Sequence, residues 1–389
     1  MKLARDTLRG YILEEVLAYL IRNTGYRLLV DTSQDPEELG WRHNGLVVKG
    51  RGAVHQVDVL GELSWIPAFT YPLRLFVEAK FRRSRTGITE VRNMVATLMD
   101  VNQNNLPQLA REHGTNPQLR PKYYYAGSIF SASGFSSPAM DMALAHSVSL
   151  IELNTPEFEP LLDAVTSTAD SVVTSLSTQG TAGDNEEESG SLEDEDELND
   201  VQFPRYPGSR SRFMLALRSA FRQTLHTQTS EIPDEISALV RTLTPLIQPA
   251  TQAAFETGEL FVGMGQGPYM LVLKADDPNA FLHYAKQKPT HAVEIRWRRD
   301  VDRGATWNIT PVEPPPEGRS YRLSFRVPRP IYEWIFSTEN VRRTALDAKK
   351  KYFSSICIFH TDDEGDLLIR LQFNPDEIVA RGEILNFRE

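Results

Sequence analysis

The stretch HQVDVLGELSWIPAFTYPLRLFVEAKF (residues 55–81) holds two apolar segments with ionisable side chains set into them. The hydrophobic pattern predicts one β-strand over residues 54–63 and a second over residues 73–81, with an extended turn between them. Ionisable groups that face inward from strands are costly to bury, so they need a partner, a metal ion or a catalytic role. The fold must therefore bring these groups to something that compensates their charge.

The alternation of strand side chains puts Gln56 and Asp58 on one face of the first strand, and Glu78 and Lys80 on one face of the second. If the two strands form a hairpin, the two carboxylates and the lysine converge. Two carboxylates at one point repel each other unless a cation lies between them. Oxygen ligands with open water positions suit Mg²⁺ or Mn²⁺ rather than zinc, and a lysine beside such a metal can orient or help deprotonate a bound water. A structural ion network between the strands is the alternative.

Helical and strand-like patterns alternate along the first 160 residues. We expect helices at residues 8–23, 88–101 and 137–145, and strands at residues 26–30, 54–63, 73–81, 123–130 and 148–153. This order predicts an α/β domain over residues 1–160.

The remaining chain divides into two parts by composition. Residues 165–203 are rich in Ser, Thr, Gly, Asp and Glu with almost no aromatic residues, which predicts a disordered acidic linker. An acidic segment that competes for a basic groove is the alternative. Residues 206–389 mix helical and strand-like runs and predict an α+β domain, to which the sequence assigns no definite role among recognition, sensing and assembly.

The formal net charge of −10 is concentrated in one segment, because residues 181–200 hold ten Asp or Glu and no Lys or Arg. Residues 1–125 contain 17 Lys or Arg against 13 Asp or Glu, so this part is mildly basic. An acidic composition therefore does not exclude a nucleic acid partner, for which the local field matters most.

Cysteine usage and hydropathy indicate the compartment. The single cysteine, Cys357, excludes a disulfide framework within the chain and a cysteine-based zinc site. No stretch approaches the roughly 20 apolar residues of a membrane span, and Glu14 and Glu15 interrupt the apolar run near the start. We therefore expect a cytoplasmic protein that has no membrane partner.

Several short motifs lie around Asp58 in a fixed order. They are Gly10-Tyr11-Ile12-Leu13-Glu14, Gly25-Tyr26, Gly50-Arg51-Gly52-Ala53-Val54-His55-Gln56-Val57-Asp58, Val77-Glu78-Ala79-Lys80, Ser131-Ala132-Ser133-Gly134-Phe135-Ser136-Ser137-Pro138-Ala139, and a closing strand from Val148 to Glu152. In this order, and with nineteen residues between Asp58 and Glu78, they resemble the Mrr-like branch of restriction endonucleases in the PD-(D/E)xK nuclease superfamily. The resemblance covers residues 1 to about 155. The chain departs from the pattern in having Ala79 in place of a cysteine and no proline before Asp58.

The resemblance implies a restriction-endonuclease-like core, a mixed central sheet flanked by helices, and a role for each matched residue. Asp58, Glu78 and the backbone carbonyl of Ala79 would bind the metal, Mg²⁺ or Mn²⁺, and Lys80 would act on the attacking water. Glu14 would support the metal site or bind a second ion, with Glu15 as the alternative inward-facing residue. Gln56 would hold the nucleophilic water or a phosphate oxygen.

Basic residues near this site are candidates for contacts with the DNA backbone. Arg51 lies in a glycine-flanked turn, and Arg82, Arg83 and Arg85 follow the second strand directly. Beside a metal site they would clamp phosphates, whereas in isolation they would form a plain turn and a solvated charge cluster.

These features predict a metal-dependent DNA endonuclease, a hydrolase of phosphodiester bonds in restriction or anti-phage defence. Cutting both strands would favour a homodimer or higher homo-oligomer. The alternatives are a structure-specific repair or recombination nuclease, and a non-catalytic DNA-binding or scaffold protein that retains the fold.

Overall fold

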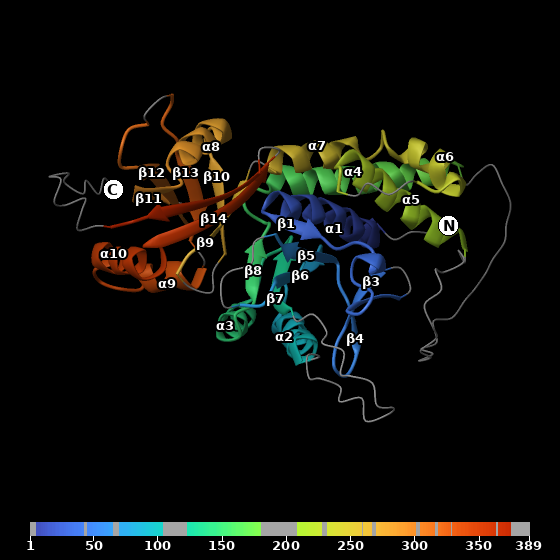
Figure 1. Cartoon of the computed structure of the whole chain (residues 1–389), viewed down its shortest axis with the longest axis horizontal. Helices are drawn as coiled ribbons and strands as arrows, with labels where there is room; N and C mark the ends of the chain where they lie inside the picture. Colours follow the sequence, from blue (N-terminus) through green and yellow to red (C-terminus); the bar gives the residue numbers. More distant parts are fainter. Residues whose placement is uncertain are drawn as a thin grey trace, which may run out of the picture.

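A computed structural model describes residues 5–42, 45–64, 70–103, 123–179, 208–227, 232–258, 260–266, 270–300, 304–315, 318–327, 329–362 and 365–374. The chain is a mixed α/β protein, with a five-stranded mixed sheet flanked by helices and a C-terminal seven-stranded β-barrel. The two parts lie side by side along the long axis of the molecule (Figure 1). Within the described residues, no helix is long and apolar enough to cross a membrane.

The central sheet has the strand order β1-β5-β6-β7-β8. Strand β5 pairs antiparallel with β1 and β6, whereas β6, β7 and β8 run parallel to one another. Its elements and their connections are α1 (Arg5–Asn23), β1 (Tyr26–Leu28), η1 (Thr32–Gln34), β5 (Val59–Leu63), β6 (Leu73–Lys80), α2 (Ile88–Gln103), β7 (Tyr124–Ser131), α3 (Ser137–Ala145) and β8 (Ser149–Glu152).

Three further strands form a separate antiparallel sheet, which we call the wing. It consists of β2 (Leu39–Arg42), β3 (Gly45–Lys49) and β4 (Val54–Gln56). The sequence predicted one strand over residues 54–63, but the structure divides it between the wing and the central sheet. The strand breaks because its first half pairs with β3 and its second half pairs with β1 and β6.

The two faces of the central sheet bury two hydrophobic cores. Helices α2 and α3 cover one face. Helix α1 lies on the other face, and a layer of four more helices packs over it (Figure 1). These helices are α4 (Glu159–Gln179), α5 (Gly208–Thr224), α6 (Asp234–Leu243) and α7 (Gln248–Thr257).

Helix α4 corrects the predicted linker. Residues 165–179 are helical, and Val165, Ala169 and Val172 are fully buried in the core that α1 shares with α7. The Ser- and Thr-rich composition concealed an apolar stripe at helical spacing, so the linker prediction is wrong for these residues. Residues 180–203 of the predicted linker lie outside the described residues. The predicted boundary at residue 206 also does not match the packing, because α5, α6 and α7 bury their apolar faces in the same core as α1.

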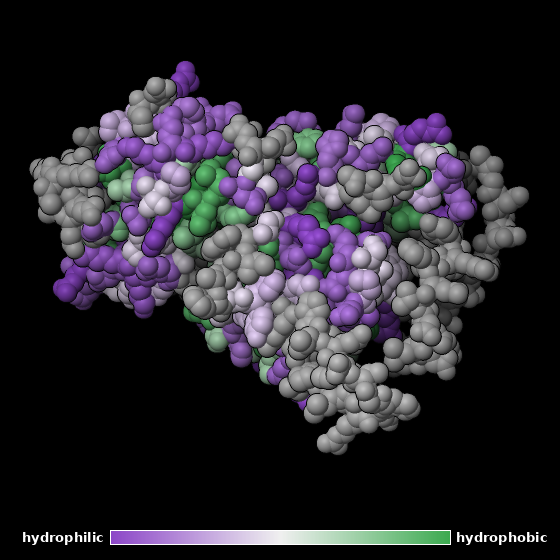
Figure 2. Space-filling model, in the orientation of Figure 1, coloured by the Kyte–Doolittle hydropathy of each residue, from purple (hydrophilic) through white to green (hydrophobic). Residues whose placement is uncertain are grey.

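The barrel closes in the strand order β10-β13-β12-β11-β15-β14-β9. The predicted mixture of helices and strands is present here, but the sequence indicated neither the closure nor the elements α8 and β12. The elements are β9 (Leu260–Met264), β10 (Met270–Ala275), α8 (Pro278–Gln287), β11 (Thr290–Asp300), β12 (Gly304–Pro311), β13 (Leu323–Arg326), α9 (Arg329–Phe336), α10 (Val341–Tyr352), β14 (Ser355–Asp362) and β15 (Gly365–Gln372). The face drawn in Figure 2 is largely hydrophilic over the helices of this part.

The barrel joins the rest of the molecule at the end of α1. Gly25 has a φ of 86°, and a Cβ at this position would overlap the ring of Phe359 from β14. Arg326 of β13 also lies 3.4 Å from a carboxylate oxygen of Glu157. Position 25 therefore requires a glycine, both because of its positive φ and because the ring of Phe359 approaches the backbone closely.

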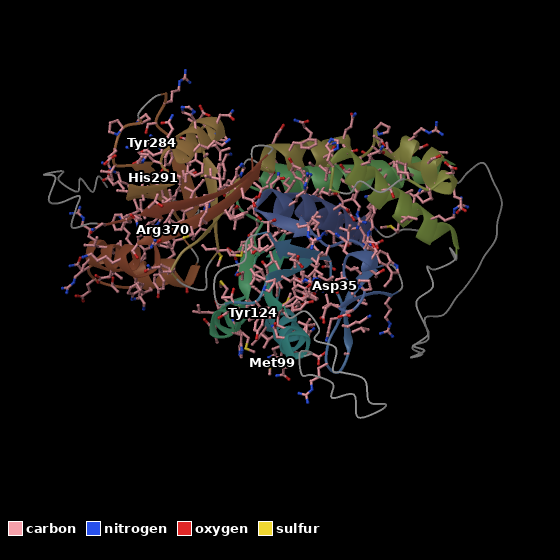
Figure 3. The ribbon with its side chains drawn as sticks, in the orientation of Figure 1. Asp35, Met99, Tyr124, Tyr284, His291 and Arg370 are labelled. Atoms are coloured by element: carbon pink, nitrogen blue, oxygen red, sulfur yellow. The ribbon has the colours of Figure 1, made fainter. Side chains whose placement is uncertain are left out.

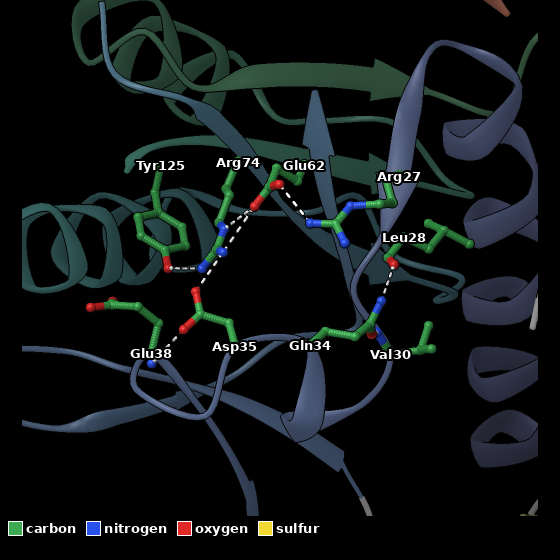
Figure 4. Close-up of polar contacts among 9 residues, drawn as sticks. All are labelled: Arg27, Leu28, Val30, Gln34, Asp35, Glu38, Glu62, Arg74 and Tyr125. Carbon is green, nitrogen blue, oxygen red and sulfur yellow. Dashed lines mark hydrogen bonds and ion pairs between the residues drawn. The ribbon is translucent and has the colours of Figure 1, made fainter. Parts of the chain in front are cut away.

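A buried arginine holds the wing side of the molecule to the central sheet (Figure 4). The side chain of Arg74 is 1% exposed and lies 2.6 Å from Asp35 and 2.9 Å from Glu62. It also donates a hydrogen bond to the Tyr125 hydroxyl, and its guanidinium stacks 3.3 Å from the ring centre of Tyr123. Asp35 is the residue that follows η1, so this network fixes the segment leading into the wing (Figures 3 and 4).

Replacing Arg74 should therefore destabilise the fold strongly. Arg74→Met leaves two carboxylates without their buried partner, and we expect a loss of about 3–5 kcal/mol in the free energy of unfolding. Arg27→Met is the matched control, because Arg27 pairs with the same Glu62 but is 56% exposed, and we expect a loss of about 1 kcal/mol or less. Urea unfolding of both variants measures the difference, and equal losses would contradict this account.

A second buried cation, in addition to Arg74, lies in the barrel part of the molecule. The Lys349 side chain of α10 is almost fully buried, and its ammonium donates to the carbonyl of Ile295 at 2.5 Å and lies 5.4 Å from the ring centre of Trp307. Elsewhere in the barrel, the rings of Tyr284 and His291 pack edge to face (Figure 3), and His291 forms a short hydrogen bond with Tyr321. Burial lowers the pKa of Lys349 to about 8.

The lowered pKa of Lys349 predicts that the free energy of unfolding depends on pH. Between about pH 8 and pH 10.5 the unfolded chain binds a proton that the folded chain does not bind at Lys349, so this residue contributes more stability as the pH rises. The free energy of unfolding of the wild type should therefore increase relative to Lys349→Met by up to about 3 kcal/mol across this window. Urea unfolding at pH 7.5 and pH 10 tests it. The exposed neighbour Lys350 provides the control variant Lys350→Met, whose difference from wild type should not change with pH.

Candidate active site

Asp58 lies at the point where the chain passes from the wing into the central sheet. Strand β4 ends at Gln56 and β5 begins at Val59, and Val57 between them is buried. The register of the β5–β6 hairpin pairs Val59 with Val77, so Asp58 lies next to the start of the pairing, on the side of Glu78. The Asp58 carboxylate accepts a hydrogen bond of 2.8 Å from the backbone N–H of Ala79.

Glu78 and Lys80 lie at the C-terminal end of β6, on the same face of the strand. Their side chains form a close ion pair and are 27% and 17% exposed. Burial is the largest effect on Asp58 and raises its pKa, and the negative charge of Glu78 raises it further. The hydrogen bond from the Ala79 N–H and the positive charge of Lys80 act in the opposite direction and lower the pKa of Asp58. The structure thus brings Asp58, Glu78 and Lys80 together as the hairpin prediction required.

Glu14 reaches the same region from α1. Its side chain is 14% exposed and lies 2.9 Å from a guanidinium nitrogen of Arg218 in α5. Burial, followed by the charge of Asp58, raises the pKa of Glu14 to about 8, although Arg218 acts in the opposite direction. Glu14 is therefore within the electrostatic field of Asp58 but has an arginine as its direct partner.

Both glutamates of α1 face inward, toward different neighbours. Glu15 is 6% exposed and lies 3.1 Å from Arg222 and 3.5 Å from Arg218, two residues one turn apart on α5. A small cavity of about 30 Å³ lies beside these charged side chains; Asp58 and Thr227 also line it, together with apolar residues of α1, β1, β5 and the wing. A partly polar cavity of this size has room for one or two water molecules.

On its other side, Asp58 faces a larger groove of about 350 Å³. One wall comes from β4 of the wing and the other from α2, so the groove runs between the wing and this helix. Its lining residues are Val54, His55, Gln56, Asp58, Phe76, Glu78, Asn93, Met94 and Thr97. The structure therefore places Gln56 in the groove together with Asp58 and Glu78, although Gln56 belongs to a different strand and sheet from the one predicted.

One carboxylate of α2, that of Asp100, makes several contacts with the wing. It accepts hydrogen bonds from the backbone N–H groups of Gly52 and Ala53 at 2.9 and 3.2 Å, and lies 2.8 Å from a ring nitrogen of His55. Burial raises the pKa of Asp100, but these three contacts outweigh that effect and leave the pKa below its ordinary value. The GRG turn is thus a structural anchor, and the exposed Arg51 within it lies 3.5 Å from Gln103.

The predicted phosphate-binding arginines lie on the loop that follows β6. All three are exposed, and Arg82 is bound to Glu90 at 2.6 Å. The Ser131–Ala139 segment braces this loop, because the hydroxyl of Ser133 donates to the carbonyl of Ser84 at 2.6 Å. Of the three arginines, Arg83 and Arg85 therefore extend to solvent most freely beside the site.

The donor set can be compared with what a divalent ion requires. Two carboxylates, Asp58 and Glu78, and the Ala79 carbonyl are oxygen donors of the kind that Mg²⁺ and Mn²⁺ bind, so the chemistry of the residues fits such an ion. Among the described residues, no group of three or more His, Cys, Asp or Glu side chains is arranged to hold a metal. Glu14 in particular is engaged by Arg218 rather than grouped with the other carboxylates.

Sequence reasoning did not find Arg218 and Arg222. They lie four residues apart on α5, and the apolar residues Phe213, Leu217 and Phe221 lie around them at helical spacing. Two arginines on the inner side of an amphipathic helix need buried acidic partners, and the adjacent glutamates of α1 are such partners. The signal was thus present, but the pairing spans about two hundred residues of sequence.

Comparison with known proteins adds little. No family model matches the sequence, and no curated protein matches it. Among solved structures, the chain is similar to one described as the crystal structure of protein of unknown function AF1548, with 16% sequence identity and a TM-score of 0.31. The match covers 63% of this chain and 98% of that chain. At this level of similarity it supports no conclusion about function.

The anchoring role of Asp100 generates a prediction. Asp100→Ala removes the acceptor of two backbone amides, so the amide protons of Gly52 and Ala53 should exchange with solvent at least about fivefold faster, in line with about 1 kcal/mol or more per lost hydrogen bond. Hydrogen–deuterium exchange with peptide or residue resolution measures this. Glu90→Ala on the same helix is the control and should leave exchange in the wing unchanged. Equal exchange in Asp100→Ala and wild type would contradict the anchor.

Proposed function

We propose that the chain is a metal-dependent DNA endonuclease with a restriction-endonuclease-like core, related to the Mrr-like branch of the PD-(D/E)xK nucleases. The observation that carries this proposal is the β5–β6 hairpin, whose register brings Asp58 beside Glu78, with Lys80 two residues further along the same strand. The order of the surrounding elements supports it. Helix α1 with Glu14 precedes the hairpin, and α2, β7, α3 and β8 follow it in a mixed sheet.

In this proposal, Asp58, Glu78 and the Ala79 carbonyl would hold Mg²⁺ or Mn²⁺. When bound, the metal would lower the pKa of a water and offset negative charge on the scissile phosphate. Lys80 would then release Glu78 and donate a hydrogen bond to the attacking water or to a phosphate oxygen. Gln56, which lines the same groove, would orient that water or a neighbouring phosphate oxygen.

The substrate would lie in the groove between the wing and α2. Arg83 and Arg85, exposed on the loop after β6, would contact the phosphates that flank the cut, with support from Arg82 and from Arg51 at the end of the wing. Cleavage of both strands of a duplex would need two such sites, and hence a homodimer or higher homo-oligomer. A role in restriction or anti-phage defence in the cytoplasm is the setting that we propose.

One observation favours a second candidate, a DNA-binding or scaffold protein without turnover. Glu78 is paired with Lys80 and Glu14 is paired with Arg218, and such ion pairs can also be a structural network. A nuclease that acts on branched DNA in repair or recombination would use the same catalytic residues, and only its preferred substrate would differ.

The proposal is tested by incubating plasmid, linear duplex and branched DNA with the purified chain and Mg²⁺. Asp58→Asn removes a metal ligand without changing its size, and Lys80→Met removes the ammonium. Each should lower the cleavage rate by about 10²- to 10⁴-fold, the range expected for a group that acts on the proton or charge of the transition state. Circular dichroism should confirm that both variants fold.

The matched control is Asp163→Asn, because Asp163 is exposed on α4, and this variant should cleave like the wild type. Cleavage that persists in Asp58→Asn and Lys80→Met would remove the site assignment. DNA binding without cleavage by the wild type, in Mg²⁺ and in Mn²⁺, would support the scaffold candidate, and a preference for branched DNA would support a repair or recombination role.

A further inference from the structure

Arg218 connects the second half of the chain to the candidate active site. Its side chain is 13% exposed, lies 2.9 Å from Glu14 and 3.5 Å from Glu15, and stands 5.3 Å from the ring centre of Tyr11. All three partners belong to α1. The guanidinium is therefore held by side chains of a single helix, α1.

The placement of Arg218 answers an electrostatic requirement of the site. Glu14 and Asp58 line the same small cavity, and like charges in a partly buried site disfavour one another. Lys80, the ion-pair partner of Glu78, favours the charged form of Asp58, and the charge of Arg218 does the same. Arg218 also supplies the cation that pairs directly with Glu14.

The neighbouring pair provides an internal comparison. Arg222 lies one turn further along α5 and contacts Glu15 at 3.1 Å. It has the same helix, the same side-chain type and a similar degree of burial, at 20% exposed against 13% for Arg218. The difference is that Arg218 contacts the glutamate within the field of Asp58, whereas the ion pair of Arg222 is with Glu15.

We propose that Arg218 is a positioning residue for the nuclease reaction, which fixes the Glu14 carboxylate toward Asp58 and completes the charge balance of the site. The proposal rests on the nuclease function proposed above. It makes the site composite, since α1, the β5–β6 hairpin and α5 each contribute a charged group. A cap that restrains Glu14 and inhibits the enzyme is the opposite role for the same contact, and the experiment separates the two.

The experiment measures kcat, KM for plasmid and the Mg²⁺ concentration that gives half-maximal rate in the full-length chain. Arg218→Gln should lower kcat by about 10- to 100-fold with little change in KM, because a displaced catalytic-site group slows the chemical step more than it weakens binding. Arg218→Lys keeps the charge and should restore at least part of the rate. Glu14→Gln combined with Arg218→Gln should be no slower than Glu14→Gln alone, because the arginine acts through that glutamate.

Arg222→Gln is the matched control and should stay within about threefold of the wild-type kcat. Three results would overturn the inference while leaving the nuclease function intact: an Arg218→Gln rate equal to or above that of the wild type, losses of Glu14→Gln and Arg218→Gln that multiply, or an equal loss in Arg222→Gln. A wild type that cleaves no DNA substrate in Mg²⁺ or Mn²⁺ would instead overturn the proposed function itself, and this inference with it. Melting temperatures of all variants distinguish a slower reaction from a smaller folded fraction.

Discussion

Asp58 lies between two other carboxylates, with Glu14 lining a small cavity on one side and Glu78 lining the groove on the other, and the repulsion that each exerts on Asp58 is the constraint that organises this part of the molecule. Like charges in a partly desolvated site disfavour one another unless cations and N–H groups are arranged around them. Here the Ala79 N–H donates to Asp58, the Lys80 ammonium pairs with Glu78, and the Arg218 guanidinium pairs with Glu14. Strand β6 supplies two of these groups, and a helix from much later in the chain supplies the third.

Helix α1 is the element on which these contributions meet. One side of it packs on the central sheet and the other side packs under α4, α5 and α7. Helix α1 therefore contributes both apolar side chains to the core beneath α4, α5 and α7 and the two inward-facing glutamates. At its end, Gly25 allows the ring of Phe359 to approach, so the barrel is seated on the same helix that reaches Asp58.

The elements nearest to the candidate site were predictable because their signals are local. The spacing of apolar residues gave α1 and α2 to within a few residues, and the alternation on residues 73–81 gave β6. The division of residues 54–63 between two sheets was not predictable, since both halves have the same strand pattern and only their partners differ. The helical state of residues 165–179 was missed because polar composition outweighed a stripe of small apolar residues.

Which residues of the candidate site lie together was likewise predictable only where the signals are local. Asp58 directly precedes β5, and Glu78 and Lys80 lie on the adjacent strand β6, so alternation and hairpin pairing suffice to bring them together. Arg218 could not be placed in this way, because nothing in the local sequence of α5 specifies which acidic residues it meets. The anchoring of His55 and the GRG turn by Asp100 likewise depends on how the wing docks on α2.

The composite core has a consequence for the modularity of this chain. A fragment that ended near residue 160 would retain every motif of the nuclease resemblance, yet it would leave one face of α1 without its cover of helices. Glu14 and Glu15 would then lose both arginine partners and lie next to a newly exposed apolar surface. The segment that carries the resemblance therefore shares its core with α5, α6 and α7, and recombination that exchanged it between proteins would have to carry these helices along to keep that core covered.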